Sequence, residues 1–206
     1  MEKLLDLLNS DLGKSLVSNT SAQLGQDKSK TASALNTALP LILGAMKNNA
    51  STKQGAQGLL GALSGKHDGS LLNNIGGLLG NSDVLNDGAG ILGHVFNGKE
   101  QNVAKAVSAK SGMDASSSMD LLKMAAPFVM AYLGKQTRQQ NVNDENGLGN
   151  LIGGMLGGGA QKEQSLITKI LDSNGDGSVI DDLIGMASGK KKKGGIGGLF
   201  GGLFGK

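Results

Sequence analysis

Residues 21–40 read SAQLGQDKSKTASALNTALP, and residues 108–127 read SAKSGMDASSSMDLLKMAAP. At an offset of 87 positions the two stretches share a Ser-Ala pair, a glycine, an aspartate, a serine, a leucine, an alanine and the final proline. The runs after the prolines also match in character, Leu41-Ile42-Leu43 against Phe128-Val129-Met130. So many matches at one offset indicate an internal duplication.

Apolar residues recur in both stretches at the three- and four-residue spacing of an α-helix. They are Leu35, Leu39, Ile42 and Met46 in the first stretch, and Leu121, Ala125, Phe128 and Leu133 in the second. The serines interpreted as helix starts are Ser29, Ser33, Ser116 and Ser118. Pro40 and Pro127 fall inside the apolar periodicity, which favours a kink over a first-turn proline.

Composition and periodicity together predict an all-α protein. Aromatic residues make up 2% of the chain, so burial must come from Leu, Ile, Val, Met and Ala. No segment alternates apolar and polar residues as a half-buried strand does. An N-terminal helical stripe is predicted from Met1, Leu5, Leu8, Leu12 and Leu16. Further helices are expected near 54–64, 70–80, 87–97, 99–110, 147–157, 162–171 and 179–187.

Glycine pairs interrupt three of the apolar stripes. Ile75 to Gly80, Ile152 to Gly157 and Ile196 to Gly201 all follow one pattern, Ile-Gly-Gly-apolar-apolar-Gly. A glycine inside a helix costs about 1 kcal/mol relative to alanine, which is offset where two backbones must approach closely. The motif therefore predicts a bundle of short Gly-rich helices, with the copies at 75 and 152 packed in the duplicated body. The copy at 196 has no evident partner.

Four parts follow from these patterns. Residues 1–140 form a duplicated helical domain with repeat cores at 21–80 and 108–157, and 141–160 form a Gly-rich connecting helix. Residues 161–188 form a helix-loop-helix that resembles an EF-hand, and 189–206 form a basic Gly/Phe tail, disordered in isolation.

The loop at 172–182, DSNGDGSVIDD, has features of a calcium site. Oxygen ligands at loop positions one, three and five, and a glycine at six, are what an EF-hand-type loop requires. Position twelve is Leu183 instead of glutamate, so any Ca²⁺ affinity should be low. The predicted ligands are Asp172, Asn174, Asp176, the carbonyl of Ser178, and Asp182. The alternative is a capped turn that needs no metal.

The tail combines a lysine run with an apolar helical stripe, a pattern that suits an anionic membrane surface or a partner groove. The predicted contact residues are Lys190, Lys191, Lys192, Lys193, Ile196, Leu199, Phe200, Leu203 and Phe204.

Five of the 20 basic residues lie at 190–206, so the rest of the chain is mildly acidic. A basic face on the folded part, which a nucleic-acid binder needs, is therefore not expected, and no nucleic-acid partner is predicted.

Other function classes have little support in the sequence. There is no cysteine, so disulfides and thiolate metal sites are excluded. The N-terminus lacks the pattern of a signal peptide, and no apolar run reaches the ~18 residues of a membrane span, which favours a cytoplasmic protein. His67 lies in a Gly-rich polar turn and His94 beside apolar residues, where a hydrogen-bonded structural histidine is the usual explanation. No catalytic or cofactor-binding residue is predicted.

A family resemblance rests on three runs of residues. They are Asp87 to Phe96 (DGAGILGHVF), Lys105 to Ser108 with Ser111 to Asp114, and Leu122 to Pro127 with Gly134-Lys135-Gln136 after it. As a set these runs resemble the bacterial domain-of-unknown-function family 937, the YidB-like proteins, over roughly residues 1–140. The resemblance implies a small helical bacterial protein and transfers no activity.

We therefore expect a non-enzymatic structural or interaction module, stabilised by calcium and tethered by its tail, that self-associates or binds a protein partner. One alternative is an enzyme whose site lies between the two repeats and includes His94. Another is a protein that binds a membrane surface through its tail. A deep polar pocket holding His94 with acids would favour the enzyme, whereas an apolar exposed groove would favour binding.

Overall fold

A computed structural model describes residues 4–74, 76 and 82–157 of this chain. Its elements are α1 (Leu4–Asn9), α2 (Asp11–Leu24), α3 (Lys28–Asn49), α4 (Lys53–Ser64), the 3₁₀ helix η1 (Ser70–Asn74), α6 (Ser82–Phe96), α7 (Glu100–Ser111), α8 (Ala115–Gln139) and α9 (Glu145–Met155). The described residues form helices and no strand, which confirms the all-α class. The predicted calcium loop and tail lie outside them.

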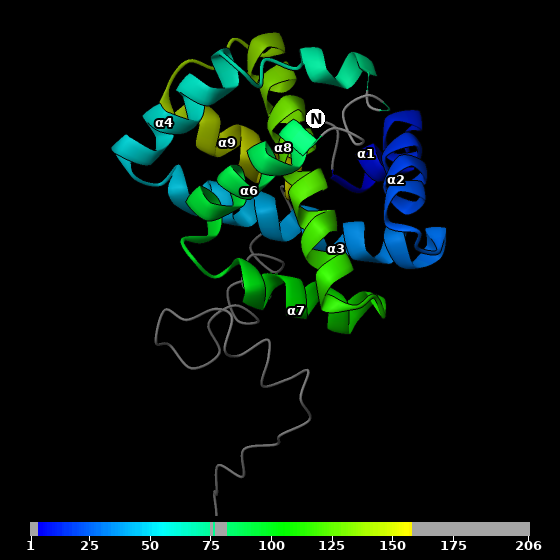
Figure 1. The fold of residues 1–206 in the computed structure, drawn as a ribbon. Helices are drawn as coiled ribbons and strands as arrows, with labels where there is room; N and C mark the ends of the chain where they lie inside the picture. Colours follow the sequence, from blue (N-terminus) through cyan, green and yellow to red (C-terminus); the bar gives the residue numbers. More distant parts are fainter. Residues whose placement is uncertain (1–3, 75, 77–81, 158–206) are drawn as a thin grey trace, which may run out of the picture.

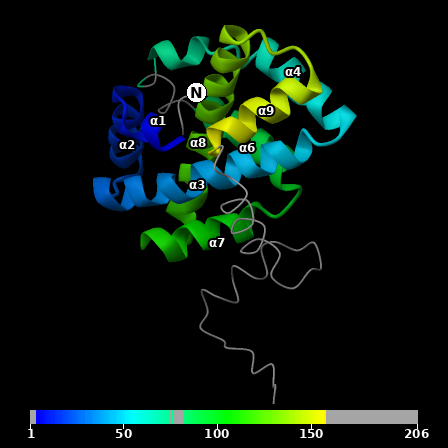
Figure 2. The same cartoon turned by 180° about the vertical axis from the view of Figure 1, so that it is seen from behind.

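The longest helix, α8, runs through the middle of the molecule, and α3 crosses it (Figures 1 and 2). Helices α6 and α7 also pack on α8. Leu35 and Ile42 of α3 and Leu121 and Phe128 of α8 are almost fully buried in one apolar cluster. Helix α9 adds Ile152 to that cluster and contacts α3, α4 and α8, so it is part of the same body.

The two stretches that share sequence adopt similar local structures. Gly25 ends α2 and Gly112 ends α7, both in the left-handed conformation, with φ of 60° and 71°. Asp27 then caps α3, accepting from the backbone N–H of the following turn, and Asp114 caps α8 in the same way.

The serine at the end of each preceding helix makes the same bond as well. The hydroxyl of Ser21 donates to the carbonyl of Gln26 over 2.8 Å, and that of Ser108 donates to the carbonyl of Met113 over 2.7 Å. Each turn is thus fixed by a glycine, a capping carboxylate and a hydroxyl at equivalent positions.

The predicted helix starts were wrong. Ser29 and Ser33 lie inside α3, and Ser116 and Ser118 lie inside α8, because aspartates two to six residues earlier act as the caps. The N-terminal stripe is also divided between two helices. Ser10 ends α1, and its hydroxyl accepts from the N–H of Gly13 to cap α2.

Both prolines lie well inside their helices, so neither is a first-turn proline. Because Pro127 has no N–H, the carbonyl of Lys123 loses its intrahelical donor. Gly88 of α6 packs at this carbonyl so closely that a Cβ on it would overlap the oxygen. The contact suits a Cα–H···O interaction, which explains why α6 crosses α8 with glycine at this point.

In the described part of the chain, the glycines that allow close backbone approach lie outside the Ile-Gly-Gly motif, whose copies at 75 and 196 fall mostly or wholly outside the described residues. A Cβ at Gly55, Gly88 or Gly134 would overlap a backbone carbonyl oxygen of a neighbouring segment. At Gly153 a Cβ would meet only the Lys47 side chain, at an ordinary 3.7 Å. Gly153 therefore does not serve the close approach of two backbones, contrary to the prediction for this glycine of the second copy. There the apolar residues, such as Ile152, are buried instead.

Candidate functional site

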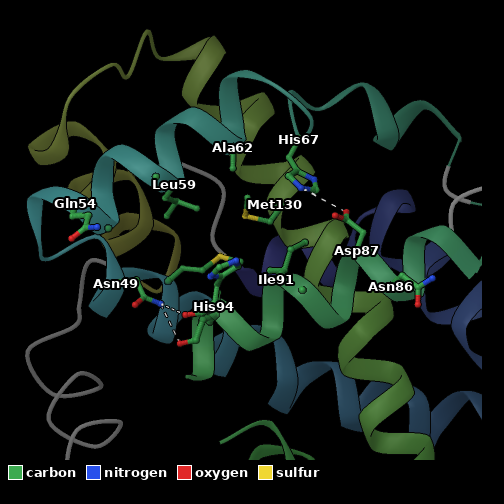
Figure 3. Close-up of a pocket in the computed structure, with 15 residues that line it drawn as sticks. Asn49, Gln54, Leu59, Ala62, His67, Asn86, Asp87, Ile91, His94 and Met130 are labelled. Carbon is green, nitrogen blue, oxygen red and sulfur yellow. Dashed lines mark hydrogen bonds and ion pairs between the residues drawn. The ribbon is translucent and has the colours of Figure 1, made fainter. Parts of the chain in front are cut away.

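A groove of about 630 Å³ lies between α4 and α6, which both pack on α8 (Figure 3). Its volume is in the range of small-molecule and peptide side-chain sites. It is lined by Met46 and Asn49 of α3; Gln54, Gly55, Gly58, Leu59 and Ala62 of α4; His67 of the next turn; Asn86, Asp87, Gly90, Ile91, His94 and Val95 of α6; and Met130 of α8.

One end of the groove is closed by an ionic cluster. The carboxylate of Asp87 lies 2.6 Å from Nζ of Lys66 and 3.6 Å from Nε2 of His67. The side chain of Asp87 is 17% exposed and that of His67 is 5% exposed, whereas Lys66 lies mostly in solvent. The cluster ties the turn after α4 to α6.

The same turn is also fixed to α8. A Cβ on Gly134 would overlap the carbonyl oxygen of His67, so glycine lets the turn lie directly on the helix. The guanidinium of Arg138 donates to both the backbone carbonyl and the carboxylate of Asp68, each over 3.0 Å. His67 is therefore held in place by its backbone as well as by its ring.

Burial lowers the pKa of the His67 imidazole, the Asp87 carboxylate opposes this, and the charge of Lys66 adds to the lowering. The ring is consequently neutral over most of the physiological range. Nδ1 is buried and has no hydrogen-bond partner in the described part of the chain, while Nε2 faces Asp87. Nδ1 is therefore closed off from the groove, and Nε2 is directed at a carboxylate.

The other end of the groove is fixed by Asn49 at the last turn of α3. Its side-chain amide donates to the carbonyls of Val95 over 3.1 Å and His94 over 3.4 Å, which α6 leaves free at its C-terminus (Figure 3). The imidazole of His94 is exposed. Both ends of the groove are thus held by polar contacts between elements distant in sequence.

Between these ends, the groove is lined mainly by apolar side chains and by glycines. Leu59, Ile91 and Met130 point into the space in Figure 3. On either side stand Gly58 and Gly90, where an added Cβ would meet nothing within 4 Å. These two glycines serve no packing contact inside the described body, and their absent side chains leave the groove open.

From the sequence, His94 was predicted only as a member of an alternative enzyme site between the repeats. The other residues that line the groove were not predicted as site residues. His67, interpreted as part of a polar turn, is almost completely buried, and Asp87 was noted only in the family-like run. The glycine-flanked position of His67 was the available signal, since a backbone held between glycines can approach another helix. Among the described residues, no group of three His, Cys, Asp or Glu side chains could hold a metal ion.

Comparison with family models identifies residues 6–136 as a match to DUF937, described as a bacterial protein of unknown function. The match covers well over half of the chain. The chain belongs to this family. Comparisons with curated proteins and with solved structures give no significant match. The family match includes all of α2, α3, α4, α6 and α7, so the groove is built almost wholly from the family region.

In the described part of the chain, no helix has both the length and the apolarity required to cross a bilayer.

Proposed function

We propose that this protein is a non-enzymatic interaction module, and that the groove between α4 and α6 binds an apolar peptide segment. The observation that carries this proposal is the pair Gly58 and Gly90, whose missing side chains face open space in a groove. Both ends of that groove are held by polar contacts. A mid-helix glycine is unfavourable by roughly 1 kcal/mol, and here no internal contact offsets that cost. An apolar floor with few polar groups suits recognition of aliphatic or aromatic side chains.

The proposal predicts that filling the groove blocks binding without unfolding the protein. The probe is the apolar dye 8-anilinonaphthalene-1-sulfonate, followed by fluorescence and by amide NMR shifts at the groove. It is titrated into the full chain with Phe200→Ser and Phe204→Ser, so that the apolar stripe predicted in the tail does not compete with the dye. Gly58→Leu should greatly weaken dye binding because its side chain enters the open space. Gly61→Leu is the matched control, since Gly61 is equally open on the same helix but does not line the groove. Equal dye binding by both variants would contradict a groove site.

Acid–base catalysis by a histidine and an aspartate is the second candidate, favoured by the contact between His67 and Asp87. A general base must present a ring nitrogen to the substrate, whereas Nδ1 of His67 is buried and Nε2 faces Asp87. None of the described residues that line the groove is Ser, Thr, Cys, Tyr or Lys, the usual nucleophiles. His94 is exposed and has no acid beside it in the lining, so binding is favoured over catalysis.

We further propose that the two hairpins, α2 with α3 and α7 with α8, descend from an internal duplication. The equivalent positions of Gly25 and Gly112, and of Asp27 and Asp114, support this. Calcium binding at residues 172–182, membrane contact through the tail, self-association and a cytoplasmic location stay predictions of the sequence.

A further inference from the structure

We propose that the occupant of the groove is the C-terminal segment of the same chain, residues 196–204. This inference rests on the proposed function, because it names the peptide that the groove binds. The segment reads IGGLFGGLF, and its apolar residues fall at i, i+3, i+4, i+7 and i+8 with glycine between them. A helix of this kind has one apolar stripe and a thin glycine face.

Shape favours this pairing. The walls of the groove carry Gly58 and Gly90, where a Cβ would meet nothing within 4 Å, so α4 and α6 present bare backbone toward the space at these positions. Between them the floor consists of long flexible or branched side chains, including Met46, Leu59 and Met130. Methionine adapts to the shape of a partner, and a thin helix with Leu and Phe on one face can lie deep between such walls.

The path of the chain places the segment within reach. Helix α9 ends near the C-terminal turn of α3, because Gly153 lies beside Lys47, where a Cβ would stand 3.7 Å from Nζ. Met46 and Asn49 of that same turn line the groove. Residues 158–195 connect this point to the segment and can span on the order of 100 Å when extended. Tethering converts docking into an intramolecular step with a high effective concentration, so the same chain is favoured over a second copy.

The test uses the full chain and takes advantage of the absence of cysteine. A nitroxide is attached at Lys206→Cys, just beyond the segment, so that the glycine face stays free of the label. Its paramagnetic broadening is read from the amide signals of the ¹⁵N-labelled protein. We expect the signals of Gly58 and Gly90 to lose most of their intensity. Phe200→Ser combined with Phe204→Ser should restore them, because those substitutions remove the apolar stripe.

Two groove variants separate docking in the groove from docking elsewhere. Gly58→Leu fills the space and should abolish the broadening, whereas Gly61→Leu, open but outside the groove, should leave it intact. Gly90→Leu provides a second block from the opposite wall. Broadening that persists in both blocked variants, or that is absent from the parent chain, overturns the inference.

A mixed sample decides which chain supplies the segment. Unlabelled spin-labelled protein is combined with ¹⁵N-labelled protein that carries no nitroxide. No broadening is expected at Gly58, and its appearance would overturn docking within one chain in favour of a second copy. If dye binding depends on Gly58 but the nitroxide in the tail broadens no groove signal, the groove binds apolar groups and the tail does not occupy it, which overturns this inference alone. If dye binding does not depend on Gly58, both the binding groove and the docking of the tail are overturned.

Discussion

Two glycines of α6, two positions apart, meet opposite surroundings. Gly88 lies against the carbonyl of Lys123 that Pro127 leaves without a donor, and Gly90 faces the open groove. Both glycines belong to one apolar run of the sequence, and their spacing does not indicate that one is packed and the other open. What distinguishes them is the helix that crosses α6, and that is a property of the folded chain.

The two positions therefore predict opposite effects of the same substitution. Gly88→Ala should destabilise the protein by about 1–3 kcal/mol, because the methyl group overlaps backbone that cannot move without shifting α8. Gly90→Ala should stabilise it by roughly 0.5–1 kcal/mol, since alanine is the better helix former and its Cβ meets nothing. Urea denaturation of both variants measures the difference. Equal stabilities would show that α6 does not cross α8 at Gly88.

At the scale of elements, the two stretches that share sequence fold into similar turns. Glycine and aspartate at fixed spacing favour a left-handed C-cap followed by an N-cap. The serines of these stretches were nevertheless predicted as the caps. Serine and aspartate are comparable capping residues, so propensity alone could not decide between Asp27 and Ser33. The hydrogen bonds do: the carboxylate of Asp27 accepts from the N–H groups of Ser29 and Lys30.

The cap of α3 gives a prediction at this scale. Asp27→Ala should cost about 1 kcal/mol of stability, because the first turn of α3 loses its side-chain acceptor. Asp27→Asn keeps an oxygen at the same position and should cost clearly less. Ser33→Ala is the matched control, since Ser33 lies inside the helix and caps nothing. Thermal unfolding of the three variants ranks them, and a larger loss at Ser33 than at Asp27 would contradict the observed helix start.

At the scale of the whole molecule, the groove is assembled from parts that no sequence pattern connects. His67 and Asp87 meet because α4 and α6 pack on the same helix, α8, with Gly134 drawing the turn onto it. Sequence reasoning predicted the helices but not their crossings, which depend on where glycine permits contact. It thus found an all-α protein and a resemblance to the correct family, and missed the buried histidine.

The burial of His67 makes stability depend on pH. Its pKa in the folded protein is lowered from the ordinary value of about 6.5, so protonation favours the unfolded state. The stability that the neutral ring contributes is fully present above pH 6.5 and is lost as the pH falls below that value toward the folded pKa. Asp87 and Lys66 are the charged groups of the cluster, and Asp87 limits the loss because its carboxylate favours the imidazolium.

We therefore expect the urea midpoint of the full chain to fall between pH 8 and pH 5.5, and the fall to be smaller in His67→Gln, which cannot titrate. Urea titrations at several pH values measure both profiles. His94→Gln is the control because it removes the other histidine of the groove, whose side chain is exposed. The comparison subtracts the contribution of carboxylates, which is common to all three proteins. If His67→Gln and the parent chain lose stability in parallel, burial does not lower the pKa of His67, and the Asp87 carboxylate offsets the desolvation of the ring.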